Sequence, residues 1–297
     1  MAFKKLNPIQ KFLLKKSDRK KYQEYKILKL IHEAPPINFV MPEKEDVYLK
    51  HSGNSGDVIY ALPSIYEIAS GKKAHVRLCI NVPHGLGKDV FHPLGSVMLN
   101  EKMAGMLKPL LMYQPEIASC EILTDEKIDA DLDLIRAYPL LKGLGNIARW
   151  YFYIFGIQTD LSKPWLQAPK DARYKDTIVI ARSHRYRNPE IDFGFLQEYG
   201  KLLFVGIKEE YEDMKKMIPH LEHKPVKDFL ELATIINSCR LFIGNQSFPF
   251  SIAEGLKVKR VLEACYYCPN VNVEGPNGYD FCYQQPFEKT VALALSR

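Results

Sequence analysis

The stretch that decides the fold is HSGNSGDVIYALP, residues 51–63. A strand-like run, VYLK (47–50), precedes it, and a helix-like run follows it as far as residue 69. The loop between these runs holds two glycines and three short polar residues: Gly53, Gly56, Asn54, Ser55 and Asp57. Such a loop is typical either of a tight strand-to-helix turn or of a site where a ligand approaches backbone N–H groups.

The alternation of strand and helix continues outward from this loop. Further strands are predicted at 75–80, 120–123, 130–135, 177–181, 202–206, 240–244 and 260–264. Helices are predicted at 58–69, 97–112, 146–157, 193–200, 209–218, 226–239, 250–257 and 287–297. This rhythm predicts an α/β protein with parallel sheets, built as two doubly wound, Rossmann-like domains that face a cleft.

Breaks in the pattern predict the domain boundaries. Three prolines interrupt residues 33–46, and residues 162–176 combine two prolines with mixed charges. We therefore expect a basic helical arm and linker over 1–45, a first Rossmann-like domain over 46–168, and a second over 169–297 with a closing helix. Ligands of such sheets bind beyond the carboxyl ends of the strands, so the cleft is the expected site.

Composition narrows the class of protein. The chain has 297 residues, 46% of them hydrophobic, and contains six scattered cysteines that form no disulfide framework. No apolar run approaches the roughly 18 residues that a membrane-spanning helix requires, and no secretory signal is visible at the start. These features predict a cytoplasmic protein.

The positive charge is concentrated at the N-terminus. Residues 1–30 contain ten Lys or Arg and two Asp or Glu, a net +8, so the rest of the chain carries −2 of the total +6. Apolar residues recur among these lysines at helical spacing, which predicts one or two amphipathic helices over 1–32. Such an arm suits an anionic membrane surface, in which case the protein is peripheral at the inner face, or nucleic acid phosphates. It equally suits simple packing through its apolar stripe.

Asp57 admits two interpretations of equal weight. It stands where a helix N-cap is expected, and Asp is a favoured N-cap. It also stands at the carboxyl end of the first strand, where a ligand of this fold binds. The loop lacks the GK[ST] ending of a Walker A motif and the GxGxxG spacing of a dinucleotide site.

A strand, a glycine loop ending in Gly56–Asp57 and a following apolar stretch with Leu-Pro resemble the N-terminal motif of glycosyltransferase family 9. This family contains the ADP-heptose:lipopolysaccharide heptosyltransferases and has the GT-B fold. LFIGNQSFPFSIAEGLKVKRVLEA (241–264) resembles the family's C-terminal motif of strand, Asp-Ser/Thr-Gly turn and helix. Asn245 replaces the motif's Asp, Ser247 its Gly and Phe250 its His, and the basic arm has no counterpart.

The resemblance implies that Asp57 is the general base of an inverting sugar transfer. Residues with N–H groups or positive charge at strand ends are the candidates for binding the donor and its diphosphate: Asn54, Ser55, Gly56, Arg182, Ser183, Arg185, Arg187, Asn245, Gln246, Ser247 and, toward a ribose, Glu254. His84 and Arg136 are candidate acceptor contacts. The DADLD run (129–133) alternates like a strand, so we expect no metal and no cofactor besides the nucleotide-sugar co-substrate.

The sequence thus predicts a glycosyltransferase that moves a sugar from a nucleotide-sugar to the hydroxyl of a surface glycan or lipid-linked acceptor. Three alternatives stay open. One is a phage-type enzyme that glycosylates DNA bases, one a non-catalytic nucleotide-sugar-binding protein, and one an epimerase on the same fold.

Overall fold

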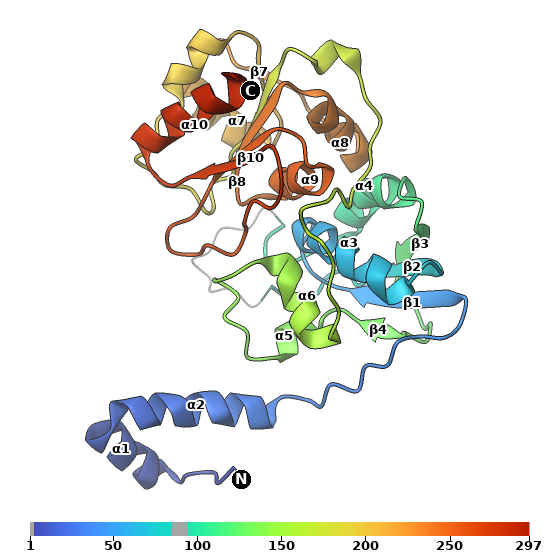
Figure 1. Ribbon diagram of the computed structural model, residues 1–297, viewed down its shortest axis with the longest axis vertical. Helices are drawn as coiled ribbons and strands as arrows, with labels where there is room; N and C mark the ends of the chain where they lie inside the picture. Colours follow the sequence, from blue (N-terminus) through green and yellow to red (C-terminus); the bar gives the residue numbers. More distant parts are fainter. Residues whose placement is uncertain (1–2, 85–93, 297) are drawn as a thin grey trace.

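The computed structural model describes residues 3–84 and 94–296, and these residues form two parallel β-sheets with associated helices (Figure 1). The predicted α/β class and the two parallel sheets are therefore confirmed. The first sheet has the strand order β3-β2-β1-β4 and the second β10-β9-β8-β5-β6-β7. Every pair of adjacent strands that belongs to these sheets is parallel.

The strands of the first sheet are β1 (Asp46–His51), β2 (Lys73–Leu78), β3 (Ile117–Ile122) and β4 (Ala130–Asp131). Those of the second are β5 (Ile178–Ala181), β6 (Leu202–Phe204), β7 (Glu222–His223), β8 (Leu241–Asn245), β9 (Arg260–Glu263) and β10 (Gly278–Phe281). We call the first sheet with its helices the first half of the chain, and the second sheet with its helices the second half. The helices of the first half are α3 (Ser55–Ala69), α4 (Glu101–Met112), α5 (Leu134–Ala137) and α6 (Ile147–Phe155). The second half has α7 (Lys208–Met217), α8 (Phe229–Ser238), α9 (Phe248–Leu256), α10 (Gln284–Ser296) and the 3-10 turns η1 (Ala172–Tyr174) and η2 (Gly194–Tyr199).

The structure corrects the sequence predictions in several places. The predicted strand 130–135 ends at Asp131, because the chain turns there into the short helix α5. The predicted helix 193–200 is the 3-10 turn η2, and the short edge strands β7 and β10 were not predicted. Both missed strands are at most four residues long and only partly buried, so they lack the apolar run that marks an inner strand.

Each sheet has a point where its strand order reverses. In the first sheet the chain proceeds outward from β1 to β2 and β3, then returns to place β4 on the other side of β1. In the second sheet it proceeds from β5 to β6 and β7 and returns to place β8 beside β5. Connections leave in opposite directions at such a switch point, which opens a crevice at the carboxyl ends of the two strands. The loops after β1, β4, β5 and β8 therefore border these crevices.

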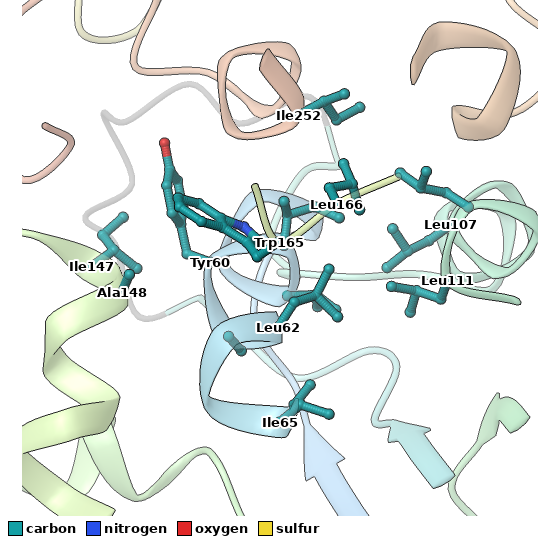
Figure 2. Packing of buried hydrophobic residues seen from close by; sticks show 14 of the residues in the cluster. Tyr60, Leu62, Ile65, Leu107, Leu111, Ile147, Ala148, Trp165, Leu166 and Ile252 are labelled. Atoms are coloured by element: carbon teal, nitrogen blue, oxygen red, sulfur yellow. The ribbon is translucent and has the colours of Figure 1, made fainter. Parts of the chain in front are cut away.

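A hydrophobic core joins the two sheets. α3 is apolar over most of its length, and it packs on α9 of the second half and on α6 of the first. Figure 2 shows Leu62 and Ile65 of α3 beside Leu107 and Leu111 of α4, with Ile252 of α9 above them. One continuous cluster of buried residues thus holds α3 against α9.

Two helices precede the first sheet, α1 (Pro8–Ser17) and α2 (Arg19–Glu33), which confirms that the basic segment is helical. Figure 1 shows this pair below the rest of the molecule, joined to β1 by an extended linker. Within the described residues, no helix combines the length and the apolar character needed to cross a membrane.

Candidate functional site

The loop after β1 is organised around a buried histidine. His51 is fully buried, and its Nδ1 accepts a hydrogen bond from the Gly53 N–H at 2.9 Å. Its Nε2 lies 2.8 Å from the Tyr151 hydroxyl, which in turn donates to the main-chain oxygen of Asp57 at 3.3 Å. Burial lowers the pKa of His51 to about 4, so the ring is neutral and its single proton lies on Nε2. This chain of bonds fixes the loop against α6.

Gly53 cannot carry a side chain in this arrangement. A Cβ there would lie 2.6 Å from Cε1 of His51 and 2.7 Å from Oδ2 of Asp57, and it would overlap the Arg136 guanidinium. The glycine is thus required because three side chains converge on its α-carbon.

Asp57 is not the N-cap of the following helix, contrary to one of the two interpretations of the sequence. Helix α3 begins at Ser55, its N-cap is Asn54, and Asp57 is the third residue of the helix. Its Oδ2 accepts the Asn54 N–H at 3.2 Å, as the acidic member of a capping box does. The side chain is about a quarter exposed. The same carboxylate therefore both caps the helix and faces the crevice.

Arg136 lies directly beside Asp57. Its Nη2 is 3.1 Å from Oδ2 of Asp57, and its Nη1 donates to Asp133. Asp133 also accepts the Ser52 N–H at 3.0 Å, which ties the loop after β4 to the loop after β1. Arg136, the predicted acceptor contact, thus lies beside Asp57, the predicted base, at the switch point of the first sheet.

Arg182 is placed differently from our expectation. Its guanidinium is buried and binds Glu263 with two bonds of 2.6 and 2.8 Å, while Nη2 also donates to the main-chain oxygen of Asn188 at 2.7 Å. Glu263, at the end of β9, also accepts the Asn188 N–H at 2.8 Å. Arg182 therefore orders the loop after β5 instead of presenting its fork to a phosphate, because a buried guanidinium needs a carboxylate partner.

The other two arginines of this loop differ in their partners. Arg187 pairs with Asp213 at 2.6 Å. Arg185 stacks on the ring of Tyr186 at 5.4 Å and has no carboxylate within salt-bridge distance among the described residues. Tyr186 has a φ of 58°, in the left-handed region, so the chain reverses sharply there. Of the three, Arg185 is the cation left available for a ligand.

The side-chain amides of Asn245 and Gln246, at the end of β8, bind main-chain groups of neighbouring loops. The Asn245 amide accepts the Ser183 N–H at 3.1 Å and donates to the main-chain oxygens of Ser183 and Arg185 at 2.9 and 2.6 Å. Gln246 accepts the Cys265 N–H at 2.6 Å and donates to the Cys268 main-chain oxygen at 2.8 Å. Both side chains are buried, so they position neighbouring loops. Ser183 is fixed by Asn245 through both its N–H and its main-chain oxygen.

Ser247 is the N-cap of α9, and its hydroxyl caps no N–H of that helix. The start of a helix attracts an anion through its dipole and through free N–H groups. In α9, Pro249 has no N–H and the Phe250 N–H donates to the main-chain oxygen of Ser247 at 3.0 Å, so the dipole makes the larger contribution. Gly56, in the first turn of α3, faces this helix, because a Cβ there would lie 3.7 Å from Cα of Phe248 and 3.8 Å from Oγ of Ser251. The starts of α3 and α9 thus meet across the crevice.

Glu254 is one turn further along α9 and is nearly fully buried. It pairs with Lys257, and its Oε2 lies 2.5 Å from Nε of Arg260. It is not among the residues that line either cavity described below, so it does not reach a ribose as we expected. Two cations instead hold it in the core beneath the helix.

Two adjoining cavities occupy the crevice. The first, of about 220 Å³, is lined from the first half by residues 54–57 and Tyr60 and from the second half by Arg185, Tyr186, Gln246, Ser247 and Phe248. The second, of about 380 Å³, lies at the ends of β5 and β6 and has a largely apolar wall. Arg185, Ser247 and Phe248 line both cavities. An anion bound by Arg185 and the start of α9 would therefore lie between an apolar pocket and Asp57.

Tyr60 is a site residue that the sequence did not single out. It lines the first cavity, and its buried hydroxyl has no hydrogen-bond partner among the described residues. In Figure 2 this hydroxyl points away from Leu62 and Ile65. A buried hydroxyl without a partner is costly, so the geometry favours a ligand or water there. Its place inside an apolar helical run gave no sequence signal, and the same holds for Tyr151 in α6. His51, at the end of β1, and Glu210, in the charged helix α7, were not singled out either.

His84 packs against its own loop, with Nε2 2.8 Å from the main-chain oxygen of Gly95. The other histidine of that loop, His92, lies outside the described residues. Within residues 3–84 and 94–296, no group of three or more His, Cys, Asp or Glu side chains is arranged to hold a metal ion.

The fold is similar to that of solved glycosyltransferases. A glycosyl transferase family 9 structure from Veillonella parvula DSM 2008 matches with a TM-score of 0.54 and 14% identity, over 86% of this chain and 91% of that one. E. coli heptosyltransferase WaaC with ADP matches with a TM-score of 0.58 and 9% identity, over 84% and 99%. E. coli ADP-heptose lps heptosyltransferase II matches with a TM-score of 0.54 and 11% identity, over 84% and 98%.

At these identities the similarity concerns the fold, and in that respect the resemblance drawn from the two sequence motifs is confirmed. No family model matches the sequence, and no curated protein sequence is significantly similar to it.

Proposed function

We propose that this protein is a metal-independent, inverting glycosyltransferase of family 9 type, with two domains that close on a nucleotide-sugar. The observation that carries the proposal is the composition of the first cavity. It brings the Asp57 carboxylate from one half of the chain together with Arg185 and the start of α9 from the other. A base for a hydroxyl and a cradle for a diphosphate are the two elements that sugar transfer from a nucleotide diphosphate needs.

The donor binds mainly to the second half in this proposal. The apolar wall of the larger cavity, which includes Val226 and Phe229, accommodates the base. The diphosphate lies over Arg185 and the start of α9, where the guanidinium and the positive end of the helix dipole offset its charge. The similar WaaC structure was solved with ADP, which makes ADP the first nucleotide to test.

The reaction occurs where the two cavities join. Oδ2 of Asp57 is held by Arg136 and the Asn54 N–H, whereas Oδ1 has no hydrogen-bond partner among the described residues. Oδ1 takes the proton of the acceptor hydroxyl as its oxygen bonds to the anomeric carbon. The bond from that carbon to the diphosphate breaks, and the diphosphate leaves with its electron pair. Attack from the side opposite to the leaving group inverts the anomeric centre.

Arg185 and the positive end of the α9 dipole supply the positive charge that the leaving diphosphate requires, and on this basis we propose metal independence. Tyr60 contributes a hydrogen bond to the transferred sugar through its unpartnered hydroxyl. The acceptor is a surface glycan or a lipid-linked precursor bound by the first half, and the reaction takes place in the cytoplasm.

Binding and turnover are tested separately. Calorimetric titration of the purified protein with ADP and other nucleoside diphosphates identifies the nucleotide. Arg185→Ala should weaken binding of that nucleotide about tenfold or more, because it removes a charged bond to phosphate worth about 1.5–3 kcal/mol. Arg187→Ala is the matched control two residues away, since Arg187 is paired with Asp213, and it should change affinity little.

Asp57→Asn distinguishes an enzyme from a binding protein. The variant should keep its affinity for the nucleotide and lose about a hundredfold or more of transfer to an acceptor mixture, because general base catalysis contributes that much. Transfer should be unaffected by EDTA. If no nucleoside diphosphate binds, or if Asp57→Asn transfers sugar as fast as the original protein, the proposal is wrong.

A further inference from the structure

The N-terminal helical pair carries apolar residues that the molecule leaves exposed. Seven large apolar side chains of α1 and α2 are between 49% and 71% exposed: Ile9, Phe12, Leu13, Ile27, Leu28, Leu30 and Ile31. Figure 1 shows the pair standing apart from both sheets. An exposed apolar patch of this kind marks a surface that meets a partner or a membrane.

The pair is nevertheless an ordered unit. The N-terminal segment folds back on α2, where Phe3 stacks on Tyr25 and on His32 at ring separations of 5.5 and 4.9 Å. The Leu6 N–H donates to the Tyr25 hydroxyl at 3.0 Å. Asp18 ends α1 and caps α2, with its carboxylate accepting the Lys21 N–H at 2.9 Å. The exposed apolar residues therefore remain after the pair has satisfied its own packing.

The exposed residues recur at helical spacing. Ile9, Phe12 and Leu13 on α1 repeat the i, i+3, i+4 pattern that Ile27, Leu30 and Ile31 form on α2. Residues three and four apart lie on one side of a helix. On α2 this side is opposite to Tyr22, Tyr25 and Lys29, the residues that are at least partly buried. Each helix thus presents an apolar stripe directed away from the interior of the pair.

The positive charge of the helical pair indicates an anionic partner. The same 30 residues carry ten basic and two acidic side chains. We propose that the pair formed by α1 and α2 docks the protein on an anionic lipid bilayer, with the apolar stripes in the headgroup region and the lysines on lipid phosphates. A basic helix with a strong apolar side lies in the membrane interface in this way, and long lysine stems extend to the polar layer.

Other partners fit these observations less well. Nucleic acid phosphates require the charge but leave seven large apolar residues in water. A second copy of the chain covers the apolar stripes but brings two segments of net +8 together. An anionic bilayer satisfies both features at once.

The linker between α2 and β1 determines which half of the protein the docking brings to the bilayer. The linker packs on the first half, since Phe39 meets the Phe155 ring edge to face at 4.9 Å and Tyr138 donates to the main-chain oxygen of Pro35. Tyr138 follows α5, which carries Arg136. Docking therefore brings the half that holds Asp57 to the bilayer. The docking itself does not depend on the proposed glycosyl transfer.

Sedimentation with vesicles tests the docking on the full chain. Vesicles of phosphatidylcholine alone are compared with vesicles that contain about a third phosphatidylglycerol, at about 0.15 M salt. Binding is expected to the anionic vesicles only and to weaken as salt is raised. Lys15→Gln with Lys20→Gln should weaken it about fivefold per lysine. Phe12→Ser with Ile31→Ser should weaken it about tenfold or more.

Two control variants match these changes on the body of the protein. Leu141→Ser with Leu293→Ser removes exposed apolar residues, and Lys127→Gln with Lys175→Gln removes exposed charges. Neither should alter vesicle binding. Circular dichroism of all four variants should match the original protein, because the substituted residues are exposed.

Three outcomes would overturn the inference. The first is no sedimentation with anionic vesicles. The second is tighter binding to a short DNA duplex than to the vesicles, unchanged by Phe12→Ser with Ile31→Ser. The third is a dimer that this same variant dissociates, measured by analytical ultracentrifugation. Nucleotide binding and transfer without lipid are measured on the same variants, so a failure here is distinguishable from a failure of the proposed enzyme.

Discussion

At the scale of single residues, Gly53 sets the distance between the Asp57 carboxylate and the Arg136 guanidinium. His51, Asp57 and Arg136 all approach its α-carbon, so the loop after β1 tolerates no side chain there. The general lesson is that a glycine with an unremarkable φ can still be obligatory, because neighbouring side chains occupy the space of its Cβ.

Gly53→Ala should therefore separate Arg136 from Asp57. We expect the free energy of unfolding to fall by about 1–3 kcal/mol, as when a packed region is overfilled, and transfer activity to fall further than nucleotide affinity. Gly105→Ala is the matched control, since a Cβ there meets nothing within 4 Å inside α4. It should raise stability by about 0.5–1 kcal/mol. Equal effects of the two substitutions in urea unfolding would contradict the steric account.

Asn245 stands where the motif that this stretch resembles has an Asp, and its contacts require an amide. Its amide donates to two main-chain oxygens, those of Ser183 and Arg185, which a carboxylate cannot do. Asn245→Asp, which restores the motif's residue, should lower the free energy of unfolding by about 2 kcal/mol or more. Nucleotide affinity should fall as well, because the Arg185 loop is released. The loss should shrink as the pH is lowered and the new carboxyl is protonated. A variant at least as stable as the original at neutral pH would refute this.

At the scale of secondary-structure elements, the loops that follow the switch-point strands build the site. Asp133 after β4 binds the loop after β1, and Asn245 at the end of β8 binds the loop after β5. Parallel strands bring their carboxyl ends to one edge, so these four loops meet although they are distant in sequence. The start of α7 completes this edge and carries Glu210, which lines the larger cavity.

Glu210 should make stability depend on pH. Burial raises the pKa of this carboxyl from 4.5 to about 7. Between these values the folded protein keeps a proton that the unfolded chain releases, so the free energy of unfolding falls as pH rises from about 4.5 to 7 and then levels off. Glu210→Gln should remove this contribution, with a difference of about 3 kcal/mol developing across that window. Urea unfolding at several pH values measures it, and parallel curves for the two proteins would count against the raised pKa.

At the scale of the whole molecule, the core connects the two sheets. The cluster that contains α3 also includes Val179 of β5, Leu262 of β9 and Ile252 of α9. A second cluster, which includes Ile218, lies within the second half alone. Because the first cluster crosses from one sheet to the other, loss of one half exposes apolar surface of the other.

The body of the protein should consequently unfold in a single transition in scanning calorimetry. Ile252→Ala in the shared cluster and Ile218→Ala in the second cluster should each cost about 2–5 kcal/mol. Both should move the same transition to lower temperature. If two transitions appear, and Ile218→Ala moves only one of them, the halves are thermodynamically independent and the shared cluster does not couple them.

Local pattern in the sequence determined the elements. Apolar runs of strand and helix length predicted β1, α3, β5, β8 and α9, and their alternation predicted the parallel sheets. The same pattern placed Asp57 at the carboxyl end of β1, because a strand, a glycine loop and a helix are adjacent in the chain. It also predicted the helical, basic N-terminus.

Only the tertiary structure decided which polar residues face the crevice. Arg182, Arg185 and Arg187 look alike in sequence, yet Arg182 is buried against Glu263, Arg187 is paired with Asp213, and Arg185 alone lines both cavities without such a partner among the described residues. Burial and pairing depend on residues far away in the chain. The sequence records the chemistry of each side chain, whereas its role follows from the charge that the fold brings beside it.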